Sequence, residues 1–302
     1  MRWAVAALAA GLGVVACSDD GGAAADDRPS VVVTTSILGD VVSSLLGDAA
    51  EITVVMPPGS SPHDFQASAR DAQAMREADL LVVNGAGFEA GLGDVIEGAE
   101  ADGAVVHEAI APVDPLTLAD GQGVDPHFFT DPSRMAVAAR GILDAATAQV
   151  PALDTDEVRA DAEAYIAELE SLDAEVEAIL APVAEARRVL VTNHEVFGYL
   201  ADRYGFEVVG AVIPGGGTGD SASAAELAAL AVVIDEAGVP AIFADTSSPI
   251  DLAETLADEV GNVDVVVLFS ESLGEPGSGG ETYVDMVRTN AQRIAGALAG
   301  DG

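Results

Sequence analysis

The sequence predicts an α/β protein of two lobes, each with a four-stranded, mostly parallel sheet flanked by helices, joined by one long rigid helix. Three observations support this fold class. From Ser30 onward, short β-branched runs alternate with helical stretches rich in Ala, Leu and acidic residues, as is typical of parallel βαβ units. The runs form two sets of four, separated by a segment without strand signals. At roughly 150 residues per domain, 302 residues provide for two cores.

Each expected strand is an apolar run bounded by turn-forming or helical sequence. The first set lies at residues 31–34, 52–55, 80–83 and 104–106, and the second at 189–192, 208–212, 241–244 and 265–269. Open α/β sheets bind ligands at the carboxyl ends of their strands. The loops that follow strands in both lobes are therefore where functional residues are expected.

The segment at residues 154–181 predicts the connecting helix. Its apolar residues step by threes and fours, which places them on one helix face. Asp154 is expected to cap the start, with Glu157 three residues on, and Pro182 follows the last apolar residue. Such a helix is about 40 Å long. The predicted division is an N-terminal lobe at 30–151, a connecting helix at 152–185 and a C-terminal lobe at 186–302.

The first residues predict an export signal. Arg2 precedes an apolar run at 3–15, which is too short to cross about 30 Å of hydrocarbon as a mature helix. Small residues then lead to Cys17, the only cysteine. Residues 1–17 resemble a bacterial lipoprotein signal, with Cys17 as the lipidated first residue of the mature chain. Residues 18–29 are small and acidic, as expected of a flexible tether.

The charge balance excludes several classes of function. Lys and Arg together number 12 against 51 Asp and Glu, for a net charge of −39, and all the basic residues are Arg. A chain without lysine cannot perform P-loop or Schiff-base chemistry, which require that amine. Nucleic acid is not an expected partner, because its binding needs clustered positive charge. An acidic surface favours cationic partners, although it also fits a salt-tolerant source.

The candidate functional residues are histidines in loops. His63 lies in a Pro-rich loop after the second strand, His127 lies between two Asp-Pro turns, and His194 ends the fifth strand. Glu271 follows the eighth strand. Three imidazoles and a carboxylate that converge between the lobes would suit a divalent transition metal. Their spacing alone is not diagnostic. His107 follows the expected fourth strand and is interpreted as a structural residue.

Residues 31–302 resemble the solute-binding lipoproteins of zinc and manganese ABC transporters, a family with two α/β lobes and one connecting helix. The resemblance lies in short motifs spread over both lobes. They are Thr34-Thr35-Ser36-Ile37-Leu38-Gly39-Asp40, Pro57-Pro58-Gly59, Pro62-His63-Asp64-Phe65, residues 78–85 with Glu89, Asp125-Pro126-His127, Asp131-Pro132, His194 with Phe197 and Tyr199, Tyr204-Gly205-Phe206, and residues 268–274.

The resemblance implies a set of metal ligands. The first three ligand positions of the family fall on His63, His127 and His194. Glu271 falls near the fourth position, which is more often Asp in the family. Asp245 and Glu195 are alternatives for that position, or acceptors that orient a ligating imidazole. Asp64, Asp125 and Asp131 are further candidates for such acceptors, but the ordinary role of Asp beside Pro or His in turns is structural, and they are left out of the predicted site.

Three His and one Glu favour Zn²⁺, with Mn²⁺ as the alternative, because manganese prefers more oxygen ligands. The histidine-rich loop of many zinc members is missing, since residues 108–123 contain no His. A closed shell of four protein ligands leaves no open position for a reactive water, so we expect a binding protein and not an enzyme.

The resemblance further implies a monomer, lipid-anchored at the outer face of the cytoplasmic membrane, or periplasmic where an outer membrane exists. Its partners are the ABC permease and its ATPase. The alternatives are a siderophore-type solute-binding protein, which predicts an aromatic or Arg-lined cleft, and a zinc hydrolase, which predicts turnover. Adhesion to host surfaces is ascribed to some members of the family, and the residues give no evidence about it.

Overall fold

The computed structural model describes residues 28–118, 121, 123–213, 222–246 and 250–299. The predicted signal with Cys17, most of the tether and the Gly-rich run at 215–217 lie outside these residues. Among the described helices, none is long and apolar enough to cross a membrane.

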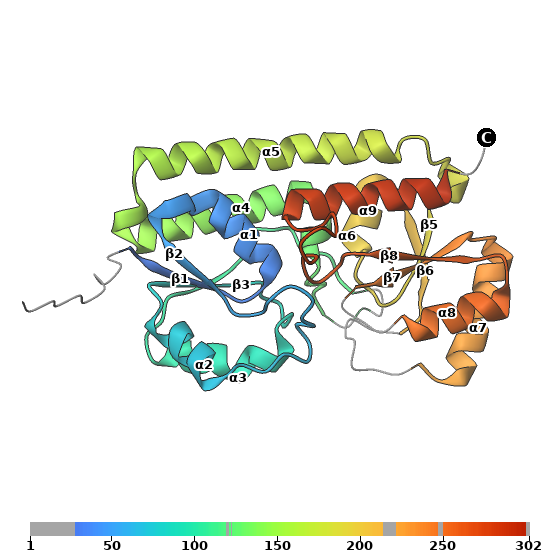
Figure 1. The fold of residues 1–302 in the computed structure, drawn as a ribbon, viewed down its shortest axis with the longest axis horizontal. Coiled ribbons are helices and arrows are strands. Elements are labelled where there is room, and N and C mark those ends of the chain that lie inside the picture. Colours follow the sequence, from blue (N-terminus) through green and yellow to red (C-terminus); the bar gives the residue numbers. More distant parts are fainter. Residues whose placement is uncertain (1–27, 119–120, 122, 214–221, 247–249, 300–302) are drawn as a thin grey trace, which may run out of the picture.

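Two four-stranded sheets, with every pairing parallel, lie side by side and form the two lobes (Figure 1). The first has the order β2-β1-β3-β4 and the second the order β6-β5-β7-β8, so the two lobes repeat one topology. The strands are β1 Ser30–Val33, β2 Glu51–Val54, β3 Leu80–Val83, β4 Val106–Glu108, β5 Val189–Thr192, β6 Glu207–Ala211, β7 Ala241–Asp245 and β8 Asp264–Leu268. The predicted fold class is confirmed.

The fourth strand differs from its prediction. It lies at Val106–Glu108 and not at 104–106, because Leu81 of β3 pairs with Val106 and the Leu81 N–H donates to the Val105 carbonyl at 2.8 Å. This register puts His107 within β4, opposite Val82, and not after the strand. The apolar run therefore begins in the preceding turn.

Helices cover both faces of each sheet, as Figure 1 shows. They are α1 Ser36–Leu46, α2 Ala69–Glu77, α3 Gly93–Ala101, α4 Pro132–Gln149, α5 Asp156–Leu180, α6 Gly198–Tyr204, α7 Ala224–Ala237, α8 Asp251–Val260 and α9 Tyr283–Leu298. Helices α2 and α3 pack on one face of the first sheet, and α7 and α8 on the corresponding face of the second. The opposite faces look toward α1, α4 and α9, above which α5 lies.

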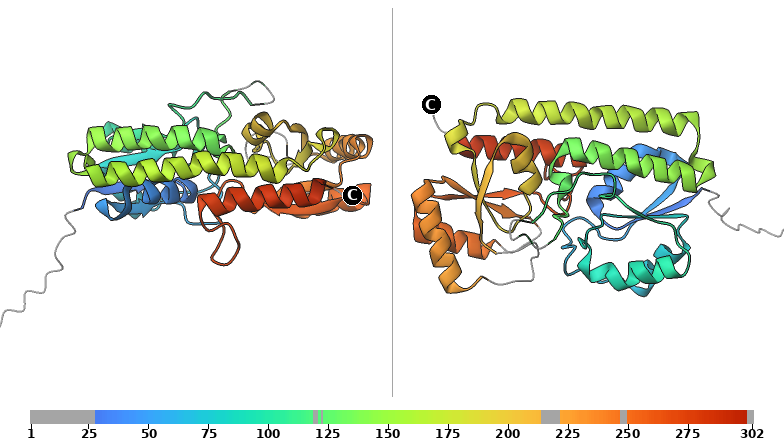
Figure 2. Two further views of the ribbon diagram at one scale, coloured as in Figure 1. Left: turned by 90° about the horizontal axis from the view of Figure 1, so that it is seen from above. Right: turned by 180° about the vertical axis from the view of Figure 1, so that it is seen from behind.

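Helix α5 is the predicted long helix between the lobes. Its 25 residues extend about 38 Å over α4 on one side and α1 and α9 on the other, as Figure 2 shows from above. The cap is not Asp154 but Thr155, whose extended backbone lets its hydroxyl accept from the Val158 N–H at 3.2 Å. The Asp154 carboxylate instead pairs with Arg159 at 2.7 Å.

A single large apolar core joins the lobes. It contains Leu38 of α1, Ile142 of α4, Leu169 of α5 and Ile294 of α9, all fully buried or nearly so. Smaller apolar clusters fill the faces covered by α2 and α3 and by α7 and α8. The lobes are thus fastened to one another on the α5 side, while the loops after their strands meet between them.

Candidate metal centre

Four side chains from both lobes converge on one point. His63, His127, His194 and Glu271 each offer a ligand atom, and these atoms all lie within 4.8 Å of one another. The Glu271 Oε1 atom is the centre of the group. It lies 2.6 Å from the His63 Nε2, 3.1 Å from the His194 Nε2 and 3.6 Å from the His127 Nε2. The structure therefore brings together all four residues that the sequence nominated as metal ligands.

His63 comes from the long loop between β2 and α2. A Pro57-Pro58-Gly59 turn begins this loop, and the Phe65 N–H donates to the Ser61 carbonyl at 3.1 Å, so the segment around His63 is internally braced. The His63 side chain is 12% exposed, whereas those of the other three cluster residues are fully buried. His63 therefore stands at the solvent side of the cluster.

His127 comes from the loop before α4 and is oriented by Asp125. The Asp125 Oδ1 atom accepts from the His127 backbone N–H at 2.9 Å and lies 2.8 Å from the His127 Nδ1. A carboxylate accepts hydrogen bonds, so Nδ1 carries a proton and Nε2 faces Glu271 and the other imidazoles. This pairing is the usual way in which proteins fix the ring of a metal-binding histidine.

The C-terminal lobe supplies its two residues almost directly from strand ends. His194 follows β5, and its carbonyl accepts from the Thr192 hydroxyl at 2.7 Å. Its Nδ1 lies 3.7 Å from the Asp245 Oδ2 at the end of β7, which is looser than the Asp125 pair. Glu271 follows β8. Its neighbour Ser272 accepts from the Gly59 N–H at 2.7 Å, so Glu271 stands at a direct contact between the lobes.

Burial and charge act against each other within the cluster. Burial alone would lower the pKa of His127, but hydrogen bonds and charges of Asp125 and Glu271 outweigh it and raise the pKa to about 9. Burial would likewise raise the pKa of Glu271, but hydrogen bonds with the three imidazoles hold it well below the usual range. The metal-free cluster thus holds a carboxylate beside a protonated His127 at neutral pH, and a bound cation would replace that proton.

An aromatic wall closes the N-terminal side of the cluster. The buried Phe88 ring lies 5.7 Å from the His63 ring and 5.6 Å from the His127 ring, between centroids, and Phe129 lies 5.9 Å from His127. Phe88 is followed by the buried Glu89, which accepts from the Thr34 hydroxyl at 2.6 Å and from the Asn84 N–H. The two phenylalanine rings thus pack against the imidazoles, which restricts the orientation of the imidazole rings.

Other candidates lie outside the group of four. His107 is in β4, where burial lowers its pKa. Glu195 lines a neighbouring cavity of about 420 Å³ together with Asp125. Asp245 sits behind His194, in the position of an orienting acceptor and not at the centre. Asp131 has the structural role predicted for it, since it caps α4 by accepting from the Ser133 N–H at 2.8 Å.

The structure decides the role of Asp125, which the sequence left open between a turn residue and an orienting acceptor, because its carboxylate contacts the His127 ring. The sequence signal that was available is its position two residues before the histidine, which lets one carboxylate reach both the backbone and the ring of His127. Phe88 and Tyr199 are further residues around the site that local pattern did not single out as functional.

Three imidazole nitrogens and one carboxylate oxygen, all within 4.8 Å of one another, are a donor set that fits a divalent transition metal. The donors come from both lobes, so a bound ion would also cross-link them.

Known proteins match most of the length of this chain. The family described as zinc-uptake complex component A, periplasmic, matches residues 31–297. The chain is 30% identical to the manganese-binding lipoprotein MntA of Halalkalibacterium halodurans over 98% of this chain and 96% of that protein. It is 33% identical to the zinc-binding protein TroA of Treponema pallidum, over 90% of this chain and 89% of that one. The solved structure of TroA matches with a TM-score of 0.84 at 31% identity, covering 90% of this chain and 99% of that one.

Proposed function

The chain belongs to the family of the periplasmic component A of zinc-uptake complexes, and we propose that it captures Zn²⁺ through His63, His127, His194 and Glu271. Members of this family are solute-binding proteins and not enzymes, and the chain is the extracytoplasmic metal-binding subunit of an ABC importer. We propose the identity of the ion, its four ligands, the membrane anchor and the immediate partners.

The donor set supports zinc over manganese. Relatives named for zinc and for manganese match this chain about equally well, so relatedness does not select the ion. Three of the four donors are imidazole nitrogens, and zinc favours nitrogen in a four-coordinate shell, whereas manganese favours more oxygen. The single observation that carries the proposal is this convergence of three Nε2 atoms on one carboxylate.

We propose that Cys17 carries a lipid that holds the protein, as a monomer, at the outer face of the cytoplasmic membrane. The predicted N-terminal lobe, connecting helix and C-terminal lobe then stand clear of the membrane on the 18–29 tether. The immediate partners are the permease, which receives the ion, and its ATPase. A Cys17→Ser variant is expected to lose incorporation of a labelled fatty acid, and labelling equal to that of the parent chain would contradict the anchor.

The metal is tested by direct competition. The soluble chain from Ser18 to Gly302 is stripped with a chelator, exposed to equimolar Zn²⁺ and Mn²⁺, and its metal content is measured after desalting. We expect one equivalent of zinc. The matched control is His107→Ala, which removes the one histidine outside the cluster and is expected to retain the ion, whereas His127→Ala is expected to lose it.

Each other outcome has a defined meaning. One equivalent of manganese would keep the importer function and reverse the ion. No stoichiometric metal in the parent protein would contradict the metal site. Retention of the ion by His127→Ala would contradict the ligand assignment.

A further inference from the structure

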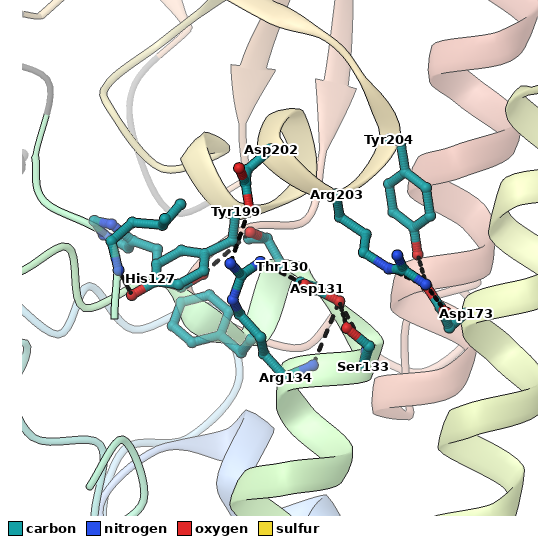
Figure 3. A network of polar contacts seen from close by, with 12 residues as sticks. His127, Thr130, Asp131, Ser133, Arg134, Asp173, Tyr199, Asp202, Arg203 and Tyr204 are labelled. Carbon is teal, nitrogen blue, oxygen red and sulfur yellow. Dashed lines mark hydrogen bonds and ion pairs between the residues drawn. The ribbon is translucent and has the colours of Figure 1, made fainter. Parts of the chain in front are cut away.

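The residue that orients His127 is itself held by the opposite lobe. The Asp125 carboxylate bonds the His127 ring, while the Asp125 backbone carbonyl accepts from the Tyr199 hydroxyl at 2.7 Å. Tyr199 lies on α6 of the C-terminal lobe and is fully buried. Figure 3 shows the Tyr199 ring reaching toward the segment that carries His127. A continuous path of contacts therefore runs from α6 to one candidate ligand of the other lobe.

The Tyr199 side chain is fixed on several sides. Its hydroxyl also accepts from the Leu116 N–H at 3.0 Å, so it both donates and accepts. The Arg134 guanidinium lies over its ring, 4.9 Å from the centroid. Burial raises the pKa of Tyr199 to about 12, so the hydroxyl keeps its proton and remains a donor at neutral pH.

Arg134, which lies beside Tyr199, forms ion pairs with residues of both lobes. Its Nη1 lies 2.7 Å from the Asp131 Oδ2, at the start of α4, and its Nη2 lies 2.8 Å from the Asp202 Oδ2, on α6. Asp131 and His127 belong to one short segment, so this bridge fixes α6 against the segment whose other end is held by Tyr199. Figure 3 shows both contacts together.

We propose that Tyr199 is a positioning residue through which the contact between the lobes sets the metal affinity of His127. The inference rests on the proposed function. Coupling of this kind is reciprocal: if the α6 contact strengthens metal binding, a bound metal strengthens the α6 contact by the same factor. A membrane partner that shifts α6 away from residues 125–131 would thereby weaken the hold on the ion without touching any ligand.

The chain offers a matched control on the same helix. Tyr204 is also buried, and its hydroxyl donates to the Asp173 Oδ1 of α5 at 2.9 Å. This contact also fastens α6 to the rest of the molecule, but it does not lead to Asp125 or His127. Figure 3 shows Tyr204 beside Asp173, and Tyr199 beside Arg134. Tyr199→Phe and Tyr204→Phe each remove one buried hydroxyl and keep the ring.

The experiment measures zinc affinity by chelator competition and zinc release by stopped flow, on the soluble chain from Ser18 to Gly302. We expect Tyr199→Phe to weaken affinity about three- to tenfold and to speed release similarly, as loss of one buried hydrogen bond predicts. Tyr204→Phe is expected to change affinity less than twofold, although it lowers the melting temperature of the metal-free protein as Tyr199→Phe does.

A double-mutant cycle separates positioning from general loosening. If Tyr199 acts through Asp125, then Tyr199→Phe has no further effect on affinity in an Asp125→Ala background. Asp202→Ala removes a carboxylate that is 52% exposed, is expected to weaken affinity about twofold, and serves if Tyr199→Phe folds poorly. Equal effects of the two Phe variants, an unchanged affinity in Tyr199→Phe, or a full additional loss in the Asp125→Ala background would overturn the inference. Failure of the parent protein to bind zinc would instead overturn the proposed function.

Discussion

The two lobes share one sheet order but deliver their candidate ligands differently. In the C-terminal lobe, His194 and Glu271 follow β5 and β8 almost directly, so the sheet itself aims them. In the N-terminal lobe, His63 and His127 lie well beyond the ends of β2 and β4, on long loops. These loops are held by a diproline turn and the Asp125 carboxylate within them, and by the Phe88 ring and the Tyr199 hydroxyl from outside them.

The difference teaches that an identical topology does not bring an identical construction of the site. A residue at a strand end inherits the rigidity of the sheet. A residue on a loop must be held by side chains, and in this protein some of those side chains belong to the other lobe. Substitutions remote from the ligands should therefore disturb the N-terminal half of the site more than the C-terminal half.

The largest effect is expected from removing ligands. His194→Ala should weaken zinc binding by more than about a hundredfold, because nothing replaces a fully buried nitrogen donor. His63→Ala should cost less, because His63 is 12% exposed and water can take its place. Both values are measured by chelator competition. An equal loss in the two variants would show that side-chain exposure does not determine how much each of these two ligands contributes to binding.

A smaller effect is expected from the acceptors behind the imidazoles. Asp125→Asn should weaken zinc binding about 10–100-fold, as is typical when the partner of a ligating histidine is changed. Asp245→Asn should weaken it less, because its oxygen lies 3.7 Å from the His194 Nδ1 against 2.8 Å for the Asp125 pair. Isothermal titration of both variants tests this order, which a larger loss in Asp245→Asn would reverse.

The N-terminal half should also determine how binding depends on pH. His127 has its pKa raised to about 9, so below this pH a proton competes with the metal. Zinc affinity should rise about tenfold per pH unit between pH 7 and 9, for one displaced proton. Titrations in buffers of different ionisation enthalpy count that proton directly. A flat profile over this range would mean that His127 is already neutral at pH 7.

The smallest effect concerns the start of α5. At its start the Thr155 hydroxyl caps the helix, and Thr155→Ala should lower the free energy of unfolding by about 1 kcal/mol. Asp154→Ala removes only an exposed ion pair with Arg159 and should cost less. Chemical denaturation of the metal-free protein measures both. A larger loss in Asp154→Ala would restore the cap that the sequence suggested.

Most of the fold could be predicted because its signals are local. Each strand is a short β-branched run between helical stretches, and the eight observed strands lie within two residues of the predicted ones. The exceptions arose where hydrogen bonding decides a boundary. Pairing with β3 places His107 within the fourth strand. The extended backbone of Thr155 makes this residue, and not Asp154, the cap of α5.

How far the site can be predicted from the sequence also differs between the two lobes. The placement of His194 and Glu271 after strands is predictable from topology alone, because ligands gather at the carboxyl ends of parallel sheets. No regular element leads to His63 and His127, and the assignment of all four residues as ligands required the resemblance to a known family. An Asp before Pro fits a turn as well as an orienting role, so the sequence leaves the role of Asp125 open. The contact of Tyr199 could not be predicted, because no local pattern encodes a partner in the opposite lobe.

Helix α5 packs along its length against helices of both lobes. Its buried stripe includes Val158 near one end, Leu169 in the middle and Val176 near the other, all within the core that the lobes share. Bending this helix would expose packed apolar surface to water, which costs a free energy of about 25 cal/mol for each Å² exposed. An opening of the lobes that bends α5 is therefore costly, so we expect the metal to leave through small displacements of the loops between the lobes.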